Sequence, residues 1–418
     1  MKVVVLGAGV VGTTSAWYLA RAGHDVVVVD RQPAPALETS FANGGQVAVS
    51  HSEPWANLGT LRRIPGWLMQ HDAPMEFHPQ YDRHQWGWAL RFLLECMPSR
   101  TSRNTRHILA LALYSLRMLQ ALRAESSIEY DQRTRGILHF YTDAREFKRA
   151  TDAADEFERM GIAVETKSAG ECIALESAFT ESHDPIVGGL YTPGDESGDA
   201  RKFTAALAMM AEAEGVRFRF NTAVEFLDMS SAEMASVAVR NDDGSDDRIR
   251  GDAYLVALGS YSPLLLRPIG VSVPVYPAKG YSITIELEEG DVAPEVSLND
   301  ESYKLVYSRL GNRLRVAGTA ALEGYNTEID PARCDAIVRR TFALFPRAGH
   351  RERAEFWTGL RPATPSNVPC IGHTKIPNLY VNTGHGTLGW TLACGSGAAI
   401  AQIIGGERPP VEFPFLGN

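Results

Sequence analysis

Three glycines near the start of the sequence have the spacing of a phosphate-binding turn. Gly7, Gly9 and Gly12 follow an apolar run and precede a stretch with helical character. Gly7 permits a tight turn, Gly9 lets a pyrophosphate approach the backbone because it has no Cβ, and Gly12 lets helix and strand pack closely. The unpaired N–H groups at such a helix start attract phosphate. The pattern, with Val10 and Val11 between the glycines, therefore predicts dinucleotide binding.

An acidic residue stands at the end of the next apolar run. Asp30 follows Gly12 by 18 residues, a position where a carboxylate accepts hydrogen bonds from ribose hydroxyls. That carboxylate would repel a 2′-phosphate, which disfavours NADP but leaves NAD and FAD open. A glycine-rich turn without a ligand is the alternative, and the combination of strand, helix and acid argues against it.

Two more glycine-rich segments suit a long ligand. One spans residues 40–46 and the other residues 382–390, just before the last apolar helix. Together they could line a ligand that extends from an adenine to a distal ring, and the last helix could aim its N-terminus at negative charge on that ring. Either segment alone is explained equally well as a turn with glycine at positive φ.

The hydrophobic pattern supplies the elements that must hold these segments in place. The β-branched runs 3–6 and 26–29, joined by a helix over 10–22, predict an opening βαβ unit. Residues 33–84 read as long loops and residues 188–199 as turns. The other predicted helices cover 86–95, 105–125, 144–160, 200–215, 334–345 and 396–404; the other strands cover 136–141, 216–220, 223–227, 235–240, 254–258, 281–287, 313–317 and 379–382, with a hairpin turn at 242–244.

This order of elements predicts an α/β fold with two discontinuous domains. A Rossmann-type nucleotide-binding domain is interrupted twice by an α+β substrate domain around a mixed or antiparallel sheet. The predicted boundaries are 1–90, 190–268 and 350–418 for the first domain, and 91–189 and 269–349 for the second.

Composition excludes several classes of protein. With 418 residues, of which 44% are hydrophobic and 22% charged, the chain is neither largely disordered nor fibrous. Its net charge of −9 argues against nucleic-acid binding. The five cysteines are widely spaced, which suggests buried thiols rather than a metal site or disulfides. The N-terminus does not read as a signal peptide, and no apolar run is long enough for a membrane span, so a cytoplasmic location is expected.

Several blocks of the sequence resemble those of a known family. Beside the N-terminal glycines, the matching blocks are residues 188–199, 252–259, 277–282, 359–365 and 384–386. On these blocks the chain resembles the D-amino acid oxidase superfamily, whose members have the glutathione-reductase-like FAD fold. Within it, residues 54–55, 81–88, 279–282 and 385–390 are most similar to the bacterial D-amino acid dehydrogenase (small subunit) branch.

The resemblance implies FAD as the cofactor and assigns residues to it. Arg31 would lie beside the ribose or adenine, and Val224 would meet the adenine through its backbone. Gly359 stands where the sarcosine oxidase branch has a flavin-linked cysteine, so the FAD is expected to be noncovalent; Ser366 replaces the acid usual after the Thr-Pro pair. The implied cofactor contacts are Gly7, Gly9, Val10, Val11, Gly12, Asp30, Arg31, Ser40, Asn43, Gly44, Gly45, Gln46, Val224, Ala257, Gly259, Gly384, His385, Gly386, Thr387, Leu388, Gly389, Trp390 and Thr391.

Arg361 is the candidate for binding a substrate carboxylate, by similarity to the glycine oxidase branch. A guanidinium matches a carboxylate with two parallel hydrogen bonds, and an interdomain salt bridge is the alternative. Gln46, Tyr281 and Lys279 are the other candidate catalytic or pocket residues. For His385 a flavin-contacting or structural role is favoured over that of a base, because its motif belongs to the cofactor loop.

The implied reaction is oxidation of a D-amino acid at Cα by hydride transfer to the flavin, followed by hydrolysis to a 2-oxo acid and ammonia. The resemblance also implies a quinone or another respiratory-chain acceptor. Residues 58–67, with Arg62 and Arg63, suggest either an ordinary loop over the active site, which is favoured, or a peripheral contact with the inner face of the cell membrane. The alternatives are an oxidase of glycine, sarcosine, proline or hydroxyproline, an L-amino acid deaminase, an NAD-dependent dehydrogenase and a noncatalytic dinucleotide-binding regulator.

Overall fold

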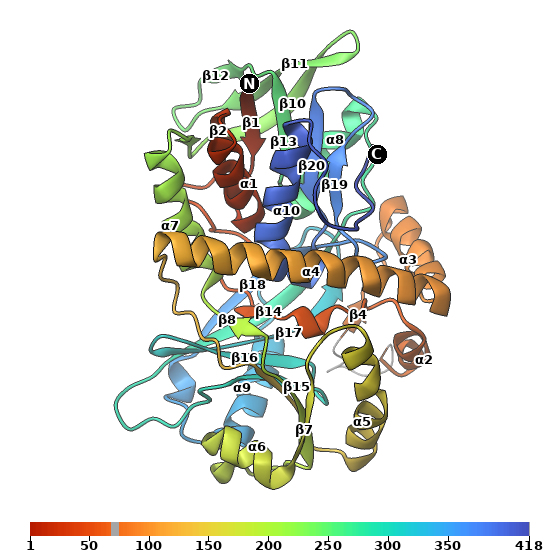
Figure 1. The fold of residues 1–418 in the computed structure, drawn as a ribbon, viewed down its shortest axis with the longest axis vertical. Coiled ribbons are helices and arrows are strands. Elements are labelled where there is room, and N and C mark those ends of the chain that lie inside the picture. Colours follow the sequence, from red (N-terminus) through yellow and green to blue (C-terminus); the bar gives the residue numbers. More distant parts are fainter. Residues whose placement is uncertain (68–74, 418) are drawn as a thin grey trace.

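The computed structural model describes residues 1–67 and 75–417. Its two main sheets lie at opposite ends of the molecule, and the long helix α4 (Pro98–Ser126) crosses between them (Figure 1). The remaining helices are α1 (Val10–Arg21), α2 (Leu58–Trp67), α3 (Arg83–Glu95), α5 (Ala144–Arg159), α6 (Ala169–Leu175), α7 (Ala200–Ala213), α8 (Ser262–Leu266), α9 (Pro331–Leu344) and α10 (Gly389–Ile404).

A six-stranded sheet forms the nucleotide-binding end, in the order β19-β20-β13-β1-β2-β9. All neighbours are parallel except β19 and β20. The predicted βαβ opening is present, because the valines of β1 and β2 are buried on both faces, as parallel strands require. The strands are β1 (Lys2–Leu6), β2 (Asp25–Val29), β9 (Arg217–Arg219), β13 (Ala253–Val256), β19 (Cys370–His373) and β20 (Leu379–Thr383).

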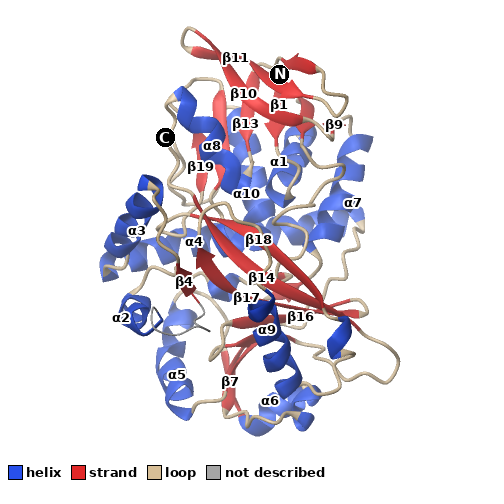
Figure 2. Ribbon diagram, turned by 180° about the vertical axis from the view of Figure 1, so that it is seen from behind, coloured by secondary structure: helices blue, strands red, loops and turns tan. Residues whose placement is uncertain are grey.

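A large mixed sheet forms the other end, in the order β18-β14-β17-β16-β15-β5-β7-β6, with β4 paired to β17. Its long strands β14, β17 and β18 lie between the six-stranded sheet and the rest of the large sheet (Figure 2). The strands are β4 (Met75–Phe77), β5 (Ile137–Tyr141), β6 (Glu165–Ser168), β7 (Gly188–Thr192), β14 (Tyr276–Glu286), β15 (Ser297–Asp300), β16 (Leu305–Leu310), β17 (Arg313–Leu322) and β18 (Glu355–Ala363).

Two small sheets complete the fold. The predicted hairpin turn joins β11 to β12 within a three-stranded antiparallel sheet, and β3 pairs with β8. The bounds are β3 (Gln46–Val47), β8 (Glu196–Ser197), β10 (Ala223–Ser230), β11 (Glu233–Arg240) and β12 (Asp246–Ile249).

Helix α10 begins at Gly389, seven residues before the predicted start at residue 396. In the sequence its glycines are typical of a loop, but in the structure they allow the helix to pack closely against its neighbours. A Cβ on Gly395 would lie 2.7 Å from Ser115 Cβ of α4, and one on Gly397 would lie 2.9 Å from the Thr14 carbonyl carbon of α1. Among the described residues, the helical segment 386–404 is long and apolar enough to span a membrane (mean hydropathy 1.3), and it is largely buried between α1 and α4.

Other sequence predictions also need correction. The predicted loops at 33–84 contain α2, β4 and the start of α3, and the turn-rich stretch 188–199 forms β7 and β8. The helix predicted over 105–125 begins at Pro98. Strands β4 and β18 belong to the large sheet, although the predicted boundaries assign them to the nucleotide-binding domain; those boundaries stay a prediction.

Candidate active site

A cavity of about 940 Å³ extends along the carboxyl ends of β1, β2 and β13 and across the large sheet. Ligands of open α/β sheets bind at this edge. Most of the predicted site residues come together here, whereas Gly12, Lys279 and Gly384 are not part of the lining. The predicted residues that line it are Gly7, Gly9, Val10, Val11, Asp30, Arg31, Ser40, Asn43, Gly44, Gly45, Gln46, Val224, Ala257, Gly259, Tyr281, Arg361, His385, Gly386, Thr387, Leu388, Gly389, Trp390 and Thr391.

The three N-terminal glycines have different environments. Gly7 adopts φ of 107°, which favours glycine, and turns the chain into α1. A Cβ on Gly12 would lie 1.9 Å from the Gly7 carbonyl oxygen, so Gly12 serves packing. A Cβ on Gly9 would meet only Ser40 Oγ, at 3.4 Å, so the space above Gly9 is open to a ligand. Ser40 Oγ also accepts a hydrogen bond from the Val10 N–H at 3.0 Å.

Asp30 and Arg31 lie in the cavity lining at the end of β2. The carboxylate of Asp30 accepts N–H bonds from Ala8 at 2.6 Å and Gln32 at 2.8 Å, which fix its orientation, while burial raises its pKa. The guanidinium of Arg31 lies 4.2 Å from the Tyr261 ring centroid and pairs with Glu38 at 2.6 Å. Tyr261 and Glu38 are not among the predicted site residues, because no local pattern in the sequence marks them as neighbours of Arg31.

The loop 40–46 and the start of α10 meet at the other end of the cavity. Gln46 donates from Nε2 to Ser297 Oγ at 2.9 Å and Asn299 Oδ1 at 2.8 Å, which ties the loop to β15. Thr391, in the first turn of α10, accepts a hydrogen bond from the Ala48 N–H at 3.1 Å. The first turn of α10 therefore faces the cavity, where its N–H groups favour negative charge.

His385, in the segment between β20 and α10, is buried, and its Nε2 has no hydrogen-bond partner within residues 1–67 and 75–417. Burial lowers the pKa of His385 to about 3. The ring is therefore neutral near pH 7, which agrees with a contact role. Gly384, by contrast, serves the backbone: its φ is 84°, and a Cβ there would lie 2.7 Å from Thr364 Cγ2.

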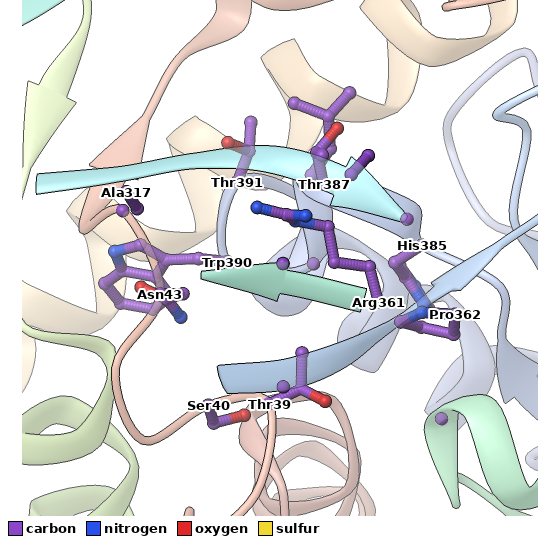
Figure 3. Close-up of a pocket in the computed structure, with 18 of the residues that line it drawn as sticks. Thr39, Ser40, Asn43, Ala317, Arg361, Pro362, His385, Thr387, Trp390 and Thr391 are labelled. Carbon is purple, nitrogen blue, oxygen red and sulfur yellow. The ribbon is translucent and has the colours of Figure 1, made fainter. Parts of the chain in front are cut away.

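Arg361, on β18, places a half-buried cation in the cavity wall (Figure 3). Its Nη1 donates to the Thr319 carbonyl at 2.7 Å and its Nη2 to the Gly318 carbonyl at 3.3 Å. No acidic side chain in the described parts of the chain pairs with it, and burial lowers its pKa to about 10. The guanidinium lies over Gly280, where a Cβ would be 2.0 Å from Nη1. Such a cation has unused donors for a carboxylate.

Lys279 does not belong to the pocket, contrary to the prediction. Its side chain is only 2% exposed and pairs with Glu323 at 2.8 Å. Burial opposes its charge, but hydrogen bonds to Glu323 and Tyr281 outweigh burial and raise the pKa of Lys279. Lys279 and Tyr281, two residues apart in β14, lie on the same face of the strand, opposite Gly280, and the Tyr281 side chain packs in the core of the large sheet. Tyr281 does line the cavity, as predicted.

A polar network on the cavity wall was not foreseen. His139 Nδ1 lies 2.9 Å from Glu301 Oε1, and His139 Nε2 lies 3.3 Å from Ser50 Oγ, which in turn donates to Asp195. Asn299 links this network to Gln46. Its members are far apart in the sequence and lie outside the glycine-rich motifs, so no spacing signal could have revealed it.

The low pKa of His385 predicts how stability changes with pH. The unfolded state, with a histidine pKa near ~6.5, takes up a proton that the folded state rejects down to about pH 3. Stability therefore rises with pH up to about 6.5 and levels off above it. Between pH 8 and 5, His385 should cost roughly 2 kcal/mol of unfolding free energy. Urea titrations should show a smaller pH dependence for His385→Gln. Surface variant His183→Gln is the control, and an unchanged pH dependence in His385→Gln would contradict the prediction.

These residues fit an FAD. One cavity brings together the open space above Gly9, the oriented carboxylate of Asp30, the unpartnered Nε2 of His385 and the first turn of α10. None of the five cysteines lines it. Noncovalent attachment stays a prediction. No metal-binding cluster of His, Cys, Asp and Glu occurs in the described part of the chain.

The fold and the site define a flavin-dependent oxidoreductase with a cation facing the substrate space. The chain belongs to the DAO family, described as FAD dependent oxidoreductase, whose family model matches residues 2–403. This match confirms the family and the FAD cofactor expected from the sequence.

Relatives named D-amino acid dehydrogenase match the whole chain. A protein named D-amino acid dehydrogenase from Dechloromonas aromatica is 57% identical over 416 residues, covering 100% of both chains. One of the same name from Paramagnetospirillum magneticum is 49% identical, covering 100% of this chain and 98% of its own. The solved structure of glycine oxidase from Bacillus cereus superposes with a TM-score of 0.73 at 21% identity, covering 97% of each chain. This last likeness confirms the predicted fold class.

Proposed function

We propose that this protein catalyses the FAD-dependent oxidative deamination of D-amino acids to 2-oxo acids and ammonia. The observation that carries the proposal is Arg361, a half-buried guanidinium in the cavity wall without an acidic partner among the described residues. A substrate carboxylate would supply that partner. The choice of D-amino acids follows the names of the two full-length relatives.

In this proposal the chain mainly positions its substrate. Arg361 holds the carboxylate, and its contacts with Gly318 and Thr319 fix the direction of the guanidinium and thus the face that Cα presents. Tyr281, packed in the core of the large sheet, lies in the adjoining wall. FAD, when bound, supplies the ring that accepts the hydride from Cα. The imino acid product then hydrolyses in water.

A dehydrogenase also needs an acceptor for the electrons of the reduced cofactor. We propose a quinone, with the protein at the inner face of the cell membrane as a peripheral protein. This part of the proposal rests on the resemblance to the dehydrogenase branch.

The test is anaerobic reduction of the purified yellow protein by paired D- and L-amino acids, glycine, sarcosine and both prolines. Loss of flavin absorbance with D-amino acids, then rapid recovery with a soluble quinone and slow recovery in air, is the expected result. Reduction by L-amino acids alone, or by glycine and sarcosine alone, would make those compounds the substrates in place of D-amino acids. A flavin that no amine reduces would overturn the function.

Gly280→Ala should weaken substrate binding through Arg361. The new Cβ would lie 2.0–2.4 Å from the guanidinium atoms, so the side chain must leave its position. We expect KM for D-amino acids to rise about tenfold or more, as misplacing a binding group does, while the FAD content stays unchanged. Steady-state kinetics of both single variants and of the double variant with Arg361→Ala check this. If Gly280→Ala weakens binding equally without Arg361, the effect does not act through the guanidinium.

A further inference from the structure

Strand β17 contains a β-bulge beside the candidate site. In the pairing of β14 with β17 the register shifts by one residue, so that Thr319 and Ala320 of β17 together face Gly280 of β14. Bulges are common next to active sites, where they redirect the groups of a strand. This bulge adjoins the site directly, because Gly280 lies under the Arg361 guanidinium and both bulge residues are part of the cavity lining.

Thr319 has an unusual backbone conformation for its residue type. Its φ is 53°, in the left-handed region that favours glycine. A side chain branched at Cβ makes this region unfavourable, so the residue stores strain. The hydroxyl adds a second cost, because Thr319 Oγ1 is buried without a hydrogen-bond partner in the described parts of the chain. Strain of this kind persists where function requires the conformation.

The left-handed conformation gives Arg361 two carbonyls from consecutive residues. Nη1 donates to the Thr319 carbonyl at 2.7 Å, and Nη2 donates to the Gly318 carbonyl at 3.3 Å. Consecutive carbonyls of a regular strand point towards opposite neighbours. Both reach one guanidinium here because Thr319 departs from the strand conformation. The conformation that strains Thr319 is therefore the one that holds Arg361.

These two bonds leave a defined part of the guanidinium free. Of its five N–H donors, one on each terminal nitrogen is bonded to β17. The Nε–H of Arg361 has no hydrogen-bond partner within residues 1–67 and 75–417. The Nε–H and the N–H of the neighbouring terminal nitrogen thus form the edge that remains for two parallel bonds to a carboxylate.

The same strand holds the cofactor loop, residues 40–46. Arg315 of β17 is buried, and its Nη1 donates to the Asn43 carbonyl at 3.2 Å. Ser308 of β16 and Ser282 of β14 donate to the next and the preceding carbonyl of the loop, both at 2.7 Å. Consecutive carbonyls fix the loop to β17 and to the two strands beside it.

We propose that β17 positions the substrate carboxylate relative to the cofactor, and that Thr319 is the positioning residue at the substrate end. Arg315 fixes the loop at the cofactor end of the strand, and the bulge at Thr319 fixes Arg361 further along it. A substrate whose carboxylate takes the free edge of the guanidinium then presents Cα in one orientation. The orientation of Cα rests on the proposed function, whereas the binding of a carboxylate does not.

Two substitutions at one position test the bulge. Thr319→Gly permits the left-handed conformation and should keep the affinity for benzoate within about threefold. Thr319→Pro fixes φ at about −65° and should weaken benzoate binding about tenfold or more, with the FAD content unchanged. Benzoate, a carboxylate without an amine, is titrated into the FAD-loaded protein and followed by the flavin absorption spectrum.

The matched controls are Ser231→Gly and Ser231→Pro. Ser231 has φ of 52° in the exposed turn between β10 and β11, outside the cavity lining. Neither control should change the affinity for benzoate, although Ser231→Pro should lower stability for the same conformational reason as Thr319→Pro.

The cofactor end is tested separately. Arg315→Ala should raise the Kd of the apoprotein for FAD about tenfold, because a charged donor to the loop is lost, and Arg315→Lys should restore part of the affinity. An unchanged Kd for FAD in Arg315→Ala would overturn the link to the cofactor.

The remaining outcomes decide the substrate end. Thr319→Pro should not reduce the residual benzoate affinity of Arg361→Ala any further. Equal affinities of Thr319→Gly and Thr319→Pro, or an equal loss with and without Arg361, would overturn the positioning role. If Thr319→Pro does not fold, a crystal structure of the parent protein with benzoate decides: a negative φ at Thr319, or a guanidinium away from both carbonyls, would overturn the proposal. Benzoate binding as expected in a protein that oxidises no amino acid would overturn the function alone.

Discussion

Arg361→Ala is expected to weaken D-amino acid binding roughly 30- to 1000-fold and leave FAD bound. Removing one partner of a desolvated, charged hydrogen-bonded pair costs about 2–4 kcal/mol or more. Burial alone shifts the pKa of Arg361, so no neighbouring cation of the described chain would compensate for its loss. Anaerobic stopped-flow reduction measures the Kd and the rate constant at saturation separately. The loss should fall mainly on Kd.

Three comparisons make this result specific. Arg361→Lys keeps the charge without the two parallel donors and should show an intermediate loss. Arg353→Ala removes an exposed arginine that pairs with Glu288 and should change nothing in catalysis. An amine that lacks the carboxylate should bind the parent protein more weakly than a D-amino acid does. In Arg361→Ala this difference in affinity should disappear. Unchanged amino-acid affinity in that variant would exclude Arg361 as the carboxylate site.

Gly9→Asp is expected to yield a folded, colourless protein, with FAD affinity reduced about a hundredfold or more. The space above Gly9 holds only Ser40 Oγ near a new Cβ, so the apoprotein can accept the side chain. A carboxylate there would occupy the pyrophosphate position and repel it, at a cost of several kcal/mol. The flavin-to-protein ratio and the titration of apoprotein with FAD measure the effect.

Gly12→Ala provides the contrast. Its Cβ would lie 1.9 Å from the Gly7 carbonyl oxygen, so α1 must move away from β1, and stability itself should fall by about 1–3 kcal/mol. Gly170→Ala, in α6 with no atom within 4 Å of the new Cβ, is the control for a helical glycine.

Stoichiometric FAD in purified Gly9→Asp would show that the pyrophosphate lies elsewhere.

The sequence predicted those parts of the fold that local patterns determine. The βαβ opening was found because its valine runs and glycine turn lie within one short segment. The start of α10 was missed because its glycines reflect tight contacts with α1 and α4, which are tertiary facts. Helix α2 was missed because its composition resembles that of a loop.

The same distinction between local patterns and tertiary contacts applies to the residues of the site. Asp30 and the loop 40–46 were found from motif spacing, and Arg361 from a resemblance. Lys279 was misplaced because the strand register that turns it towards Glu323 is not visible locally. The His139–Glu301 pair joins residues 162 positions apart, so only the packed sheet reveals it.

The order of strands in the nucleotide-binding sheet also determines when this sheet can form during translation. Strand β1 is made first, yet its neighbour β13 and the next strand β20 come from residues 253–256 and 379–383, and α10, which covers α1, comes later still. During translation the apolar faces of β1 therefore stay unburied until these later elements have been synthesised. Ribosome-associated chaperones are expected to protect such exposed apolar surface. Flavin loading must follow the emergence of α10. A chain stopped before residue 379 should thus be recognised by proteases as unfinished, however complete its phosphate-binding turn.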